Sequence, residues 1–394
     1  MTSVEQILSQ MPALAKPQFK FLVAMFAAFF AFRGKANMTN LHRFGAPHPR
    51  TQARWHNRPF DFADFNLKLV DEAHAFEHRL AAAIDASFIP KNGKHTFGLG
   101  KFYNGCHCRS ERGLEISLLA LVALDHNTAW AIDARQSPAK MPVGKTRIDW
   151  CLDQLRAQAP HFPPQVRHLL ADGQYAKTKF VNGVCDELGW ELVSKLRRDA
   201  NLRHPFTGPR RKGPGRPRKY DGKVSFEDLS RWKALGIVTA GVELFEVVAW
   251  HKSFKRKVRV VMARKKRGKK IGYVLLLSTD LELGGVEIFE MYRSRFQIEF
   301  LFRDAKGHVG LCDGQMRGEN GLGFHFQMSL AALNVLRLQE HQRGAQVVSI
   351  ASTKRRKYNE LFMNHLFDKL GLDPNDPKIT PHLDALRDYG ALAA

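Results

Sequence analysis

The first clear pattern in the chain is a strand-like alternation that begins at Leu80. In residues 80–88, LAAAIDASF, Ile84 and Phe88 fall on one face of an extended chain and Asp85 falls on the other. An ionised carboxylate in an otherwise apolar strand carries a desolvation penalty unless a cation or hydrogen bonds compensate for it. Asp85 is therefore a better candidate for a functional site than an aspartate on the surface.

The pattern that follows predicts more strands and two helices. Residues 114–125, LEISLLALVALD, and residues 128–136, TAWAIDARQ, read as two strands joined at a hairpin. Thr146 and Asp149 form a capping-box pattern ahead of a helical run. The next strand, VRHLLADGQY, ends at a second acid, Asp172, and a further helix stops at Gly189.

This order of elements predicts an α/β protein. A strand with an acid, a hairpin, a helix, a second strand with an acid and another helix is the layout of an RNase H-like core, in which a mixed sheet carries acids on adjacent strands. Four further strand-like runs follow, WELVSKL, VELFEVVAW, KVRVVMA and IGYVLLLST. They predict that a β-rich subdomain of roughly ninety residues is inserted into the core.

Helical patterns dominate both ends of the chain. The apolar stretch from Phe21 to Phe32 is twelve residues long, short of the roughly 18 to 20 that cross a bilayer, so we expect a buried helix there and no membrane contact. The predicted units are an N-terminal helical domain (1–75), the first part of the core (76–189), the inserted β-rich subdomain with basic loops (190–284), the second part of the core (285–340) and a C-terminal helical region (341–394).

The charge of the chain indicates a polyanionic partner. Lys and Arg number 61 against 38 Asp and Glu, which gives a net charge of +23, while 44% hydrophobic residues indicate a globular, enzyme-sized protein. Five cysteines without regular pairing favour a reducing cytosol, and no signal peptide pattern opens the chain, so we expect a cytoplasmic protein. Cys106, His107 and Cys108 lack a second ligand pair for zinc.

A basic segment in the predicted insertion is a candidate for contact with DNA. Residues 203–220 contain seven Lys or Arg, four Pro and no Asp or Glu. We expect a mobile loop there that binds phosphates. Its GRPRK segment partly resembles a motif that binds the minor groove of DNA. The match is short, so nonspecific binding is favoured. The candidate phosphate ligands in this loop are Arg210, Arg211, Lys212, Arg216, Arg218 and Lys219.

A second mixture of charge and aromatic rings lies in residues 48–60, HPRTQARWHNRPF. Arginines alternate there with Trp55 and Phe60, a pattern that suits a DNA surface and predicts that the N-terminal domain binds DNA ends. The competing interpretation is that Trp55 and Phe60 are core residues and the arginines point outward. The sequence leaves both open for these two aromatics.

The most informative segment comes later, in MYRSRFQIEFLFRDAKGHVGL. Tyr292, Arg295, Glu299 and Lys306 have offsets of zero, three, seven and fourteen, which place an aromatic hydroxyl, two cations and a carboxylate on one stripe of a helix that Gly307 would end. Solvated helix faces also show Arg and Glu four residues apart, so spacing alone leaves that alternative open.

The spacing Tyr-x2-Arg-x3-Glu-x6-Lys resembles the signature of insertion-sequence transposases of the DDE class, in the YREK subgroup (insertion-sequence family four). The blocks DASFIPKNGKHTFGLGKFYNG, LLADGQYAKTKF and GLCDGQMRGENGLGFHFQMSLAALNVLR look like that family in the same order, so the resemblance covers about residues 80 to 340. It implies that Asp85, Asp172 and Glu299 are catalytic and bind two Mg²⁺ ions, with Mn²⁺ also accepted. It further implies that Tyr292, Arg295 and Lys306 contact phosphates.

General chemistry agrees with this implication. Three carboxylates form the hard-oxygen cage that two divalent ions need for phosphodiester chemistry, and guanidinium and ammonium groups suit phosphate oxygens. Asp304 lies five residues after Glu299, about 140° around the helix, and is expected to face away from the cage.

One position departs from the resemblance. Relatives that excise DNA through a hairpin intermediate are thought to stack a flipped base on a Trp, whose place here is taken by Val274 in YVLLLST. Tyr273 could serve as the stacking platform, or it could be an ordinary strand residue. The route of excision stays open.

The resemblance implies a DNA transposase that binds the terminal inverted repeats of an insertion sequence, cleaves the DNA and transfers strands. Its partners would be double-stranded DNA, as element ends and target, and a second copy of the chain in the DNA complex. No nucleotide cofactor is expected, because the sequence has no phosphate-binding loop of the Gly-x4-Gly-Lys-Ser/Thr kind. The alternatives are a nuclease of the same fold without strand transfer and a domesticated DNA-binding protein without activity.

Overall fold

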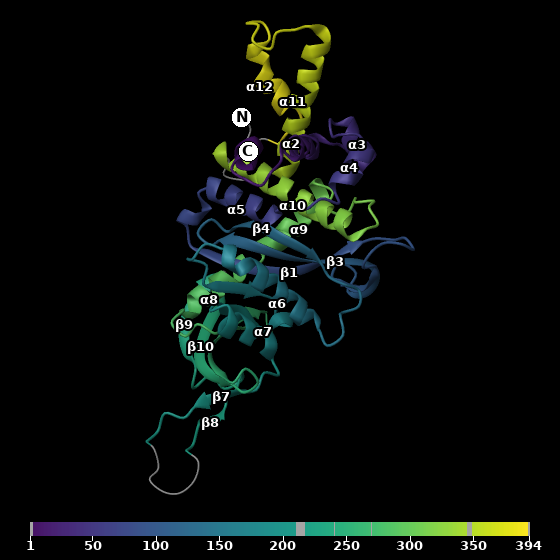
Figure 1. The fold of residues 1–394 in the computed structure, drawn as a ribbon. Helices are drawn as coiled ribbons and strands as arrows, with labels where there is room; N and C mark the ends of the chain where they lie inside the picture. The colour runs from purple at the N-terminus through teal and green to yellow at the C-terminus, as the bar shows by residue number, and fades with distance from the viewer. Residues whose placement is uncertain (1–2, 210–216, 240, 269, 345–348, 393–394) are drawn as a thin grey trace.

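The computed structural model describes residues 3–209, 217–239, 241–268, 270–344 and 349–392. Its centre is a large mixed sheet with helices on both faces. A helical hairpin extends from one end of the molecule, and two short strands extend from the other (Figure 1). The candidate site lies in the core part of the sheet.

Five strands form the core of the sheet, in the order β4-β3-β1-β5-β6. β1 is antiparallel to β3 and parallel to β5, β5 is parallel to β6, and β3 is antiparallel to β4. This order is that of the RNase H-like fold, as the sequence predicted. The strands are β1 (Leu80–Pro90), β2 (Gly100–Asn104), β3 (Arg109–Ala123), β4 (Thr128–Gln136), β5 (His168–Ala171) and β6 (Glu191–Leu196).

β1 and the second half of β3 lie in the centre of the core, because most of the side chains there are apolar and buried. Ala81, Ala82, Ala83 and Ile84 are fully buried, which is typical of strands that are covered on both faces. The predicted hairpin joins β3 to β4, and Asn127 at its turn has φ 49°, the left-handed conformation that Asn tolerates. β2 pairs with the first residues of β3.

Helices cover the two faces of the core sheet. α5 (Phe62–Glu72), α9 (Gln297–His308) and α10 (Glu319–Gln342) pack against β4, whereas α6 and α7 lie on the other side (Figure 1). α6 begins with the predicted capping box of Thr146 and Asp149. The bounds are α6 (Arg147–Gln158), α7 (Thr178–Asn182), which continues as a π-helical turn (Gly183–Glu187), and 3-10 turns at Ala75–Glu77, Ala159–His161 and Gly173–Tyr175.

The predicted inserted strands continue the core sheet. β12 pairs with β6, and the sheet proceeds through β11, β10, β7 and β8, with β9 on the other part of β10. β6, which the sequence groups with the insertion, is the fifth strand of the core because it pairs in parallel with β5. The bounds are β7 (Leu202–Pro205), β8 (Tyr220–Lys223), β9 (Lys233–Thr239), β10 (Val242–His251), β11 (Arg256–Arg267) and β12 (Lys270–Ser278).

The N-terminal region is helical, as predicted. Its Phe-rich helix is buried, and Phe26 stacks on Phe65 of the fifth helix with ring centroids 5.0 Å apart. In the described part of the chain no helix has both the length and the apolar character needed to span a bilayer. The helices are α1 (Ser3–Ser9), α2 (Lys16–Ala31), α3 (Met38–Arg43), α4 (Pro49–Trp55) and α5 (Phe62–Glu72).

The segment that carries Tyr292 to Lys306 is two helices, not the single helix that the spacing predicted. α8 (Gly285–Ser294) ends at Arg295, and α9 (Gln297–His308) begins after Phe296, with tight turns at the junction. Gly307 lies inside α9, and the positive φ of 68° falls at Gly310. The C-terminal region adds α10 (Glu319–Gln342), α11 (Ile350–Leu370) and α12 (Thr380–Asp388).

Candidate active site

The first two predicted acids lie next to each other on neighbouring parallel strands. Ile84 of β1 is opposite Ala171 of β5, so Asp85 and Asp172, the next residue on each parallel strand, emerge at the same edge of the pair. Asp85 lies within β1, as predicted, whereas Asp172 follows directly after β5. This register is the reason that two acids 87 positions apart in sequence become neighbours.

Arg295, at the junction of α8 and α9, links two of the three acids. Its Nη1 donates to Asp85 Oδ2 at 2.9 Å and its Nη2 donates to Glu299 Oε1 at 2.7 Å. Only 8% of Arg295 is exposed. A forked guanidinium can hold two carboxylates at once, so Arg295 fixes the position of α9 against β1.

Tyr292 reaches the remaining acid. Its hydroxyl donates to Asp172 Oδ1 at 3.5 Å, the outer limit of a hydrogen bond, and its ring lies 5.6 Å from the Arg295 guanidinium carbon. Asp85, Asp172, Glu299, Tyr292 and Arg295 therefore form one cluster, which we call the acid cluster.

Electrostatics in the acid cluster favour binding of a further cation. Burial raises the pKa of Asp85 to about 6; Arg295 and the Ala86 N–H oppose this shift, whereas Asp172 and Glu299 add to it. Burial also raises the pKa of Tyr292 to about 12, so the hydroxyl stays protonated. For Arg295, burial disfavours the charged form but the surrounding carboxylates outweigh it, and its pKa is raised. One guanidinium thus contacts two carboxylates, and Asp172 lies beside them in contact with Tyr292.

Lys306 contacts the protein backbone. Its ammonium donates to Ser87 Oγ and to the carbonyl of Phe88, both at 2.8 Å, and burial lowers its pKa. It ties the end of α9 to β1 just beyond Asp85. Sequence reasoning did not single out Ser87, although its place two residues after Asp85 puts it on the same face of the strand.

The donor set of the acid cluster fits a hard divalent cation. Carboxylate oxygens are the ligands that Mg²⁺ and Mn²⁺ take, and Asp85 is half-buried where its charge needs compensation. In the described part of the chain, however, no three His, Cys, Asp or Glu side chains are already gathered in a metal-holding arrangement. The reason within the acid cluster is Arg295, whose guanidinium lies between Asp85 and Glu299.

The other predicted ligands that the structure describes lie away from the acid cluster. Arg210, Arg211, Lys212 and Arg216 fall outside the described residues. Arg218 bonds Asp221 at 2.7 Å at the strand extension, and Lys219 precedes β8 there, far from β1 (Figure 1). Tyr273 on β12 has the guanidinium of Arg198 over its ring at 4.4 Å, so one face of this candidate stacking platform is covered.

Trp55 and Phe60 pack within the protein. Trp55 stacks on Phe21 with ring centroids 5.5 Å apart, and Phe60 lies 4.7 Å from Phe62. For these two aromatics the core interpretation is the one that the structure supports. Asp304 faces away from the acid cluster, as predicted, and bonds Arg337 of α10.

Comparison with known proteins identifies the family. The sequence matches the model of a family described as DDE superfamily endonuclease over residues 20–257, more than half of the chain. This range contains Asp85 and Asp172 and ends before Tyr292, so the YREK subgroup stays a prediction. None of the curated proteins matches the chain.

A solved structure is also similar. It is a cryo-EM structure of the piggyBac transposase synaptic complex with hairpin DNA, with 14% sequence identity and a TM-score of 0.43. The match covers 78% of this chain and 57% of that one, so this chain spans little more than half of its length. The family match shows that the chain belongs to the DDE superfamily endonucleases, and acids on adjacent strands of an RNase H-like sheet agree with it.

Proposed function

We propose that this protein is a DNA transposase that binds the terminal inverted repeats of an insertion sequence, cleaves the DNA at the element ends and transfers the strands to target DNA. The observation that carries the proposal is the acid cluster, in which carboxylates from β1 and α9, 214 positions apart, share one guanidinium beside Asp172. We also propose that it acts on nucleoid DNA in the cytoplasm and as a homodimer when it is bound to DNA.

Asp85, Asp172 and Glu299 would hold two divalent ions, Mg²⁺ or Mn²⁺. Such ions supply an activated water and neutralise charge on the phosphate that is attacked. In the first reaction a water oxygen bonds to phosphorus as the bond to the 3′-oxygen breaks, which leaves a 3′-hydroxyl and a 5′-phosphate. In the second, that 3′-hydroxyl bonds to a target phosphorus and a target 3′-oxygen leaves.

The remaining residues of the site position groups and compensate charge. Among the described residues, Arg295 is the cation in direct contact with the acids, and its unused N–H groups suit a phosphate oxygen. Tyr292, protonated because of its raised pKa, can donate a hydrogen bond but cannot act as a base. Lys306 holds the end of β1, so we assign it a positioning role through Ser87 and Phe88.

The test uses linear DNA that carries the candidate element ends, a supercoiled target plasmid and Mg²⁺ or Mn²⁺. Joined products support transposition; cuts alone indicate a nuclease without strand transfer, as the family description also allows; mobility shifts without cuts indicate a DNA-binding protein. Glu299→Ala should abolish the chemistry and retain binding. Glu290→Ala, which removes an exposed acid from α8, is the matched control and should leave cleavage unchanged.

A further inference from the structure

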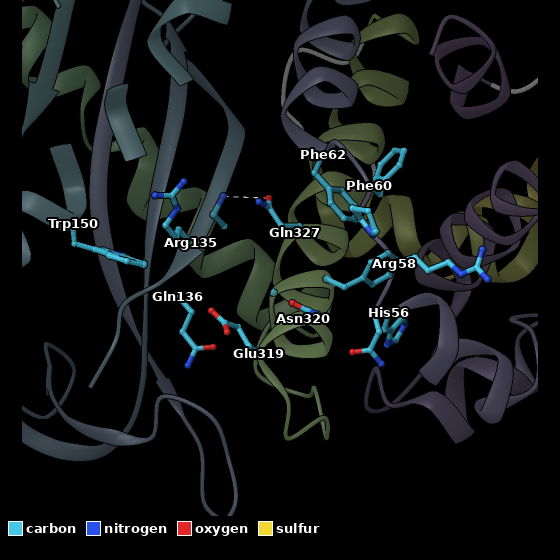
Figure 2. Close-up of a pocket in the computed structure, with 15 residues that line it drawn as sticks. His56, Arg58, Phe60, Phe62, Arg135, Gln136, Trp150, Glu319, Asn320 and Gln327 are labelled. Carbon is cyan, nitrogen blue, oxygen red and sulfur yellow. Dashed lines mark hydrogen bonds between the residues drawn. The ribbon is translucent and has the colours of Figure 1, made fainter. Parts of the chain in front are cut away.

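The helices that lie next to the core are covered by other parts of the chain. Gln327 of α10 accepts a hydrogen bond from the backbone N–H of Ala134 in β4 at 3.2 Å (Figure 2). Phe62 of α5 packs on Phe324 of α10, with ring centroids 5.3 Å apart. Most side chains of α10 are buried by contacts of this kind. The apolar face of α10 therefore has its partners within the same chain.

The hairpin of α11 and α12 differs from this region. It extends away from the rest of the molecule, with α2 and α10 at its base (Figure 1). Within residues 361–392, all of which the structure describes, Phe367 is the only one that is buried. A helix in water owes most of its stability to the packing of an apolar face, and one buried residue provides little of it. The hairpin therefore lacks a core of its own.

Large apolar side chains lie instead on the surface of the hairpin. Phe362, Leu366 and Leu370 recur every four residues, which puts them on one stripe of α11. Leu386 lies in α12, and Tyr389 follows the last residue of that helix. These side chains are between 41% and 78% exposed. We call the five residues the hairpin face.

The two helices contribute to one surface. The side-chain amide of Asn359 donates to the carbonyls of Leu386, Arg387 and Tyr389 at 3.3, 2.8 and 2.9 Å. Asn359 precedes Phe362 by three residues, and residues three apart lie on the same side of a helix. The end of α12 is therefore beside the apolar stripe of α11.

The stripe is covered at its base and open beyond it. Tyr358, four residues before Phe362, has the guanidinium of Arg33 over its ring at 5.1 Å and the ring of Phe44 at 6.3 Å. Phe362 stacks on Tyr358 but is itself 57% exposed. The hairpin face exposes roughly 500 Å² of largely apolar surface, a patch of the size that marks an interaction site on a soluble protein.

We propose that the hairpin face binds the same face of a second copy of this chain, and that the chain is a dimer before it binds DNA. Two hairpins related by a twofold axis would form a four-helix bundle, to which each copy supplies half of the core. A twofold axis brings the same residues together from both copies, so one apolar face is sufficient. With a polar rim around it, the patch approaches the roughly 800 Å² that each partner gives to a standard interface.

The charge of the hairpin argues against DNA as the partner. The whole chain has a net charge of +23, whereas residues 361–392 contain five acids against three cations and would repel a polyanion. These charges are Asp368, Asp373, Asp376, Asp384 and Asp388 against Lys369, Lys378 and Arg387. The inference rests on the proposed function, in which two copies act on two element ends, and it adds the surface through which the copies meet.

The test measures the mass of the full chain by analytical ultracentrifugation in EDTA, without DNA. At about 10 µM the wild-type chain should sediment as a dimer, and a monomer would overturn the proposal. Phe362→Glu/Leu366→Glu places carboxylates in the apolar contact and should weaken the dimer on the order of a hundredfold or more, because buried charges without partners are unfavourable. Both positions are exposed in a single copy and Glu is a good helix former, so each copy should stay folded.

The matched control is Val143→Glu/Ile237→Glu, which puts the same two charges at exposed apolar positions in other parts of the chain. It should change the dissociation constant of the dimer by no more than about twofold, because distant surface charges are screened by salt. Equal weakening in the two double variants would contradict the proposal, since added charge alone would then explain it. A dimer that persists in Phe362→Glu/Leu366→Glu would place the interface elsewhere.

Hydrogen exchange locates the interface without a substitution. The amides of α11 and α12 should exchange more slowly above the dissociation constant of the dimer than below it, whereas those of α6 should not change. Protection of the hairpin by duplex DNA at concentrations at which the chain is monomeric would assign this surface to DNA and refute the proposal. Glu299→Ala should form the dimer normally, so loss of the chemistry and loss of the dimer are separate results.

Discussion

Two arginine–aspartate pairs lie on α9 or next to it, and they differ in charge balance. Arg295 contacts Asp85 at 2.9 Å and Arg337 contacts Asp304 at 3.0 Å, so the distances are almost the same. Asp304 has a second arginine, Arg303, at 2.9 Å, and Arg337 also donates to the carbonyl of Ala129 in β4.

The charge of Asp304 is therefore fully compensated, whereas Arg295 is shared among carboxyl groups that exceed it in number. A balanced pair holds helices and strands together. An unbalanced cluster keeps acids ready for a further cation, at a cost in stability. We therefore expect the same kind of substitution to affect mainly activity at Asp85 and mainly stability at Asp304.

The largest expected difference concerns activity. Asp85→Asn removes one charge from the acid cluster, and we expect metal-dependent DNA cleavage to fall roughly a thousandfold or more, because the ions contribute several kcal/mol to the reaction. Asp304→Asn should retain most of the cleavage rate at a temperature at which it is folded. Rates from labelled element-end DNA measure both, and equal losses would show that the two pairs do not differ in function.

For the free energy of unfolding we expect the larger loss at Asp304. Asp304→Ala leaves Arg337 buried without its carboxylate, and we expect the free energy of unfolding to decrease by about 3–5 kcal/mol in urea titrations. A double variant, Asp304→Leu with Arg337→Met, removes both charges and should be much less destabilised. If the double variant loses as much as the single one, packing and not charge explains the effect.

The pH dependence of stability should follow Asp85. Its pKa rises from 3.8 in the unfolded chain to about 6 in the folded one, so the folded state binds the proton more tightly. In metal-free protein the stability contribution is fully present below pH 3.8 and is lost as the pH rises through about 6, an expected decrease of about 3 kcal/mol.

The measurement is the free energy of unfolding in EDTA at several pH values between 4 and 7. In Asp85→Asn the free energy of unfolding should decrease less with pH than in the wild-type chain, because the titrating group is gone. Asp304→Asn is the control and should keep the decrease that Asp85 causes. An unchanged profile in Asp85→Asn would assign the effect to another group.

The smallest effect is stabilisation by divalent ions. Ions that bind the folded chain but not the unfolded one raise its free energy of unfolding. The increase is about 1.4–2.7 kcal/mol at ion concentrations of ten to a hundred times the dissociation constant. Mn²⁺ or Mg²⁺ at pH 8 should therefore raise the melting temperature of the wild-type chain and of Asp304→Asn, but hardly that of Asp85→Asn. A shift that persists in Asp85→Asn would place the ion elsewhere.

Local patterns predicted the elements well because each depends on neighbouring residues. Alternation placed Asp85 in a strand, the capping box located the start of α6, and Asn127 marked the hairpin. The prediction of a single helix from Tyr292 to Lys306 was wrong, because the backbone turns at Arg295 and Phe296 between α8 and α9. Side-chain spacing alone does not report such a break.

The sequence by itself determined the strands and helices, the basic charge and the three acids, since period, caps and composition are local properties of the chain. Only the tertiary structure decided that Arg295 joins Asp85 to Glu299 and that Lys306 binds the backbone of β1. Those contacts depend on strand register and helix packing between segments far apart in sequence, and no local pattern encodes them.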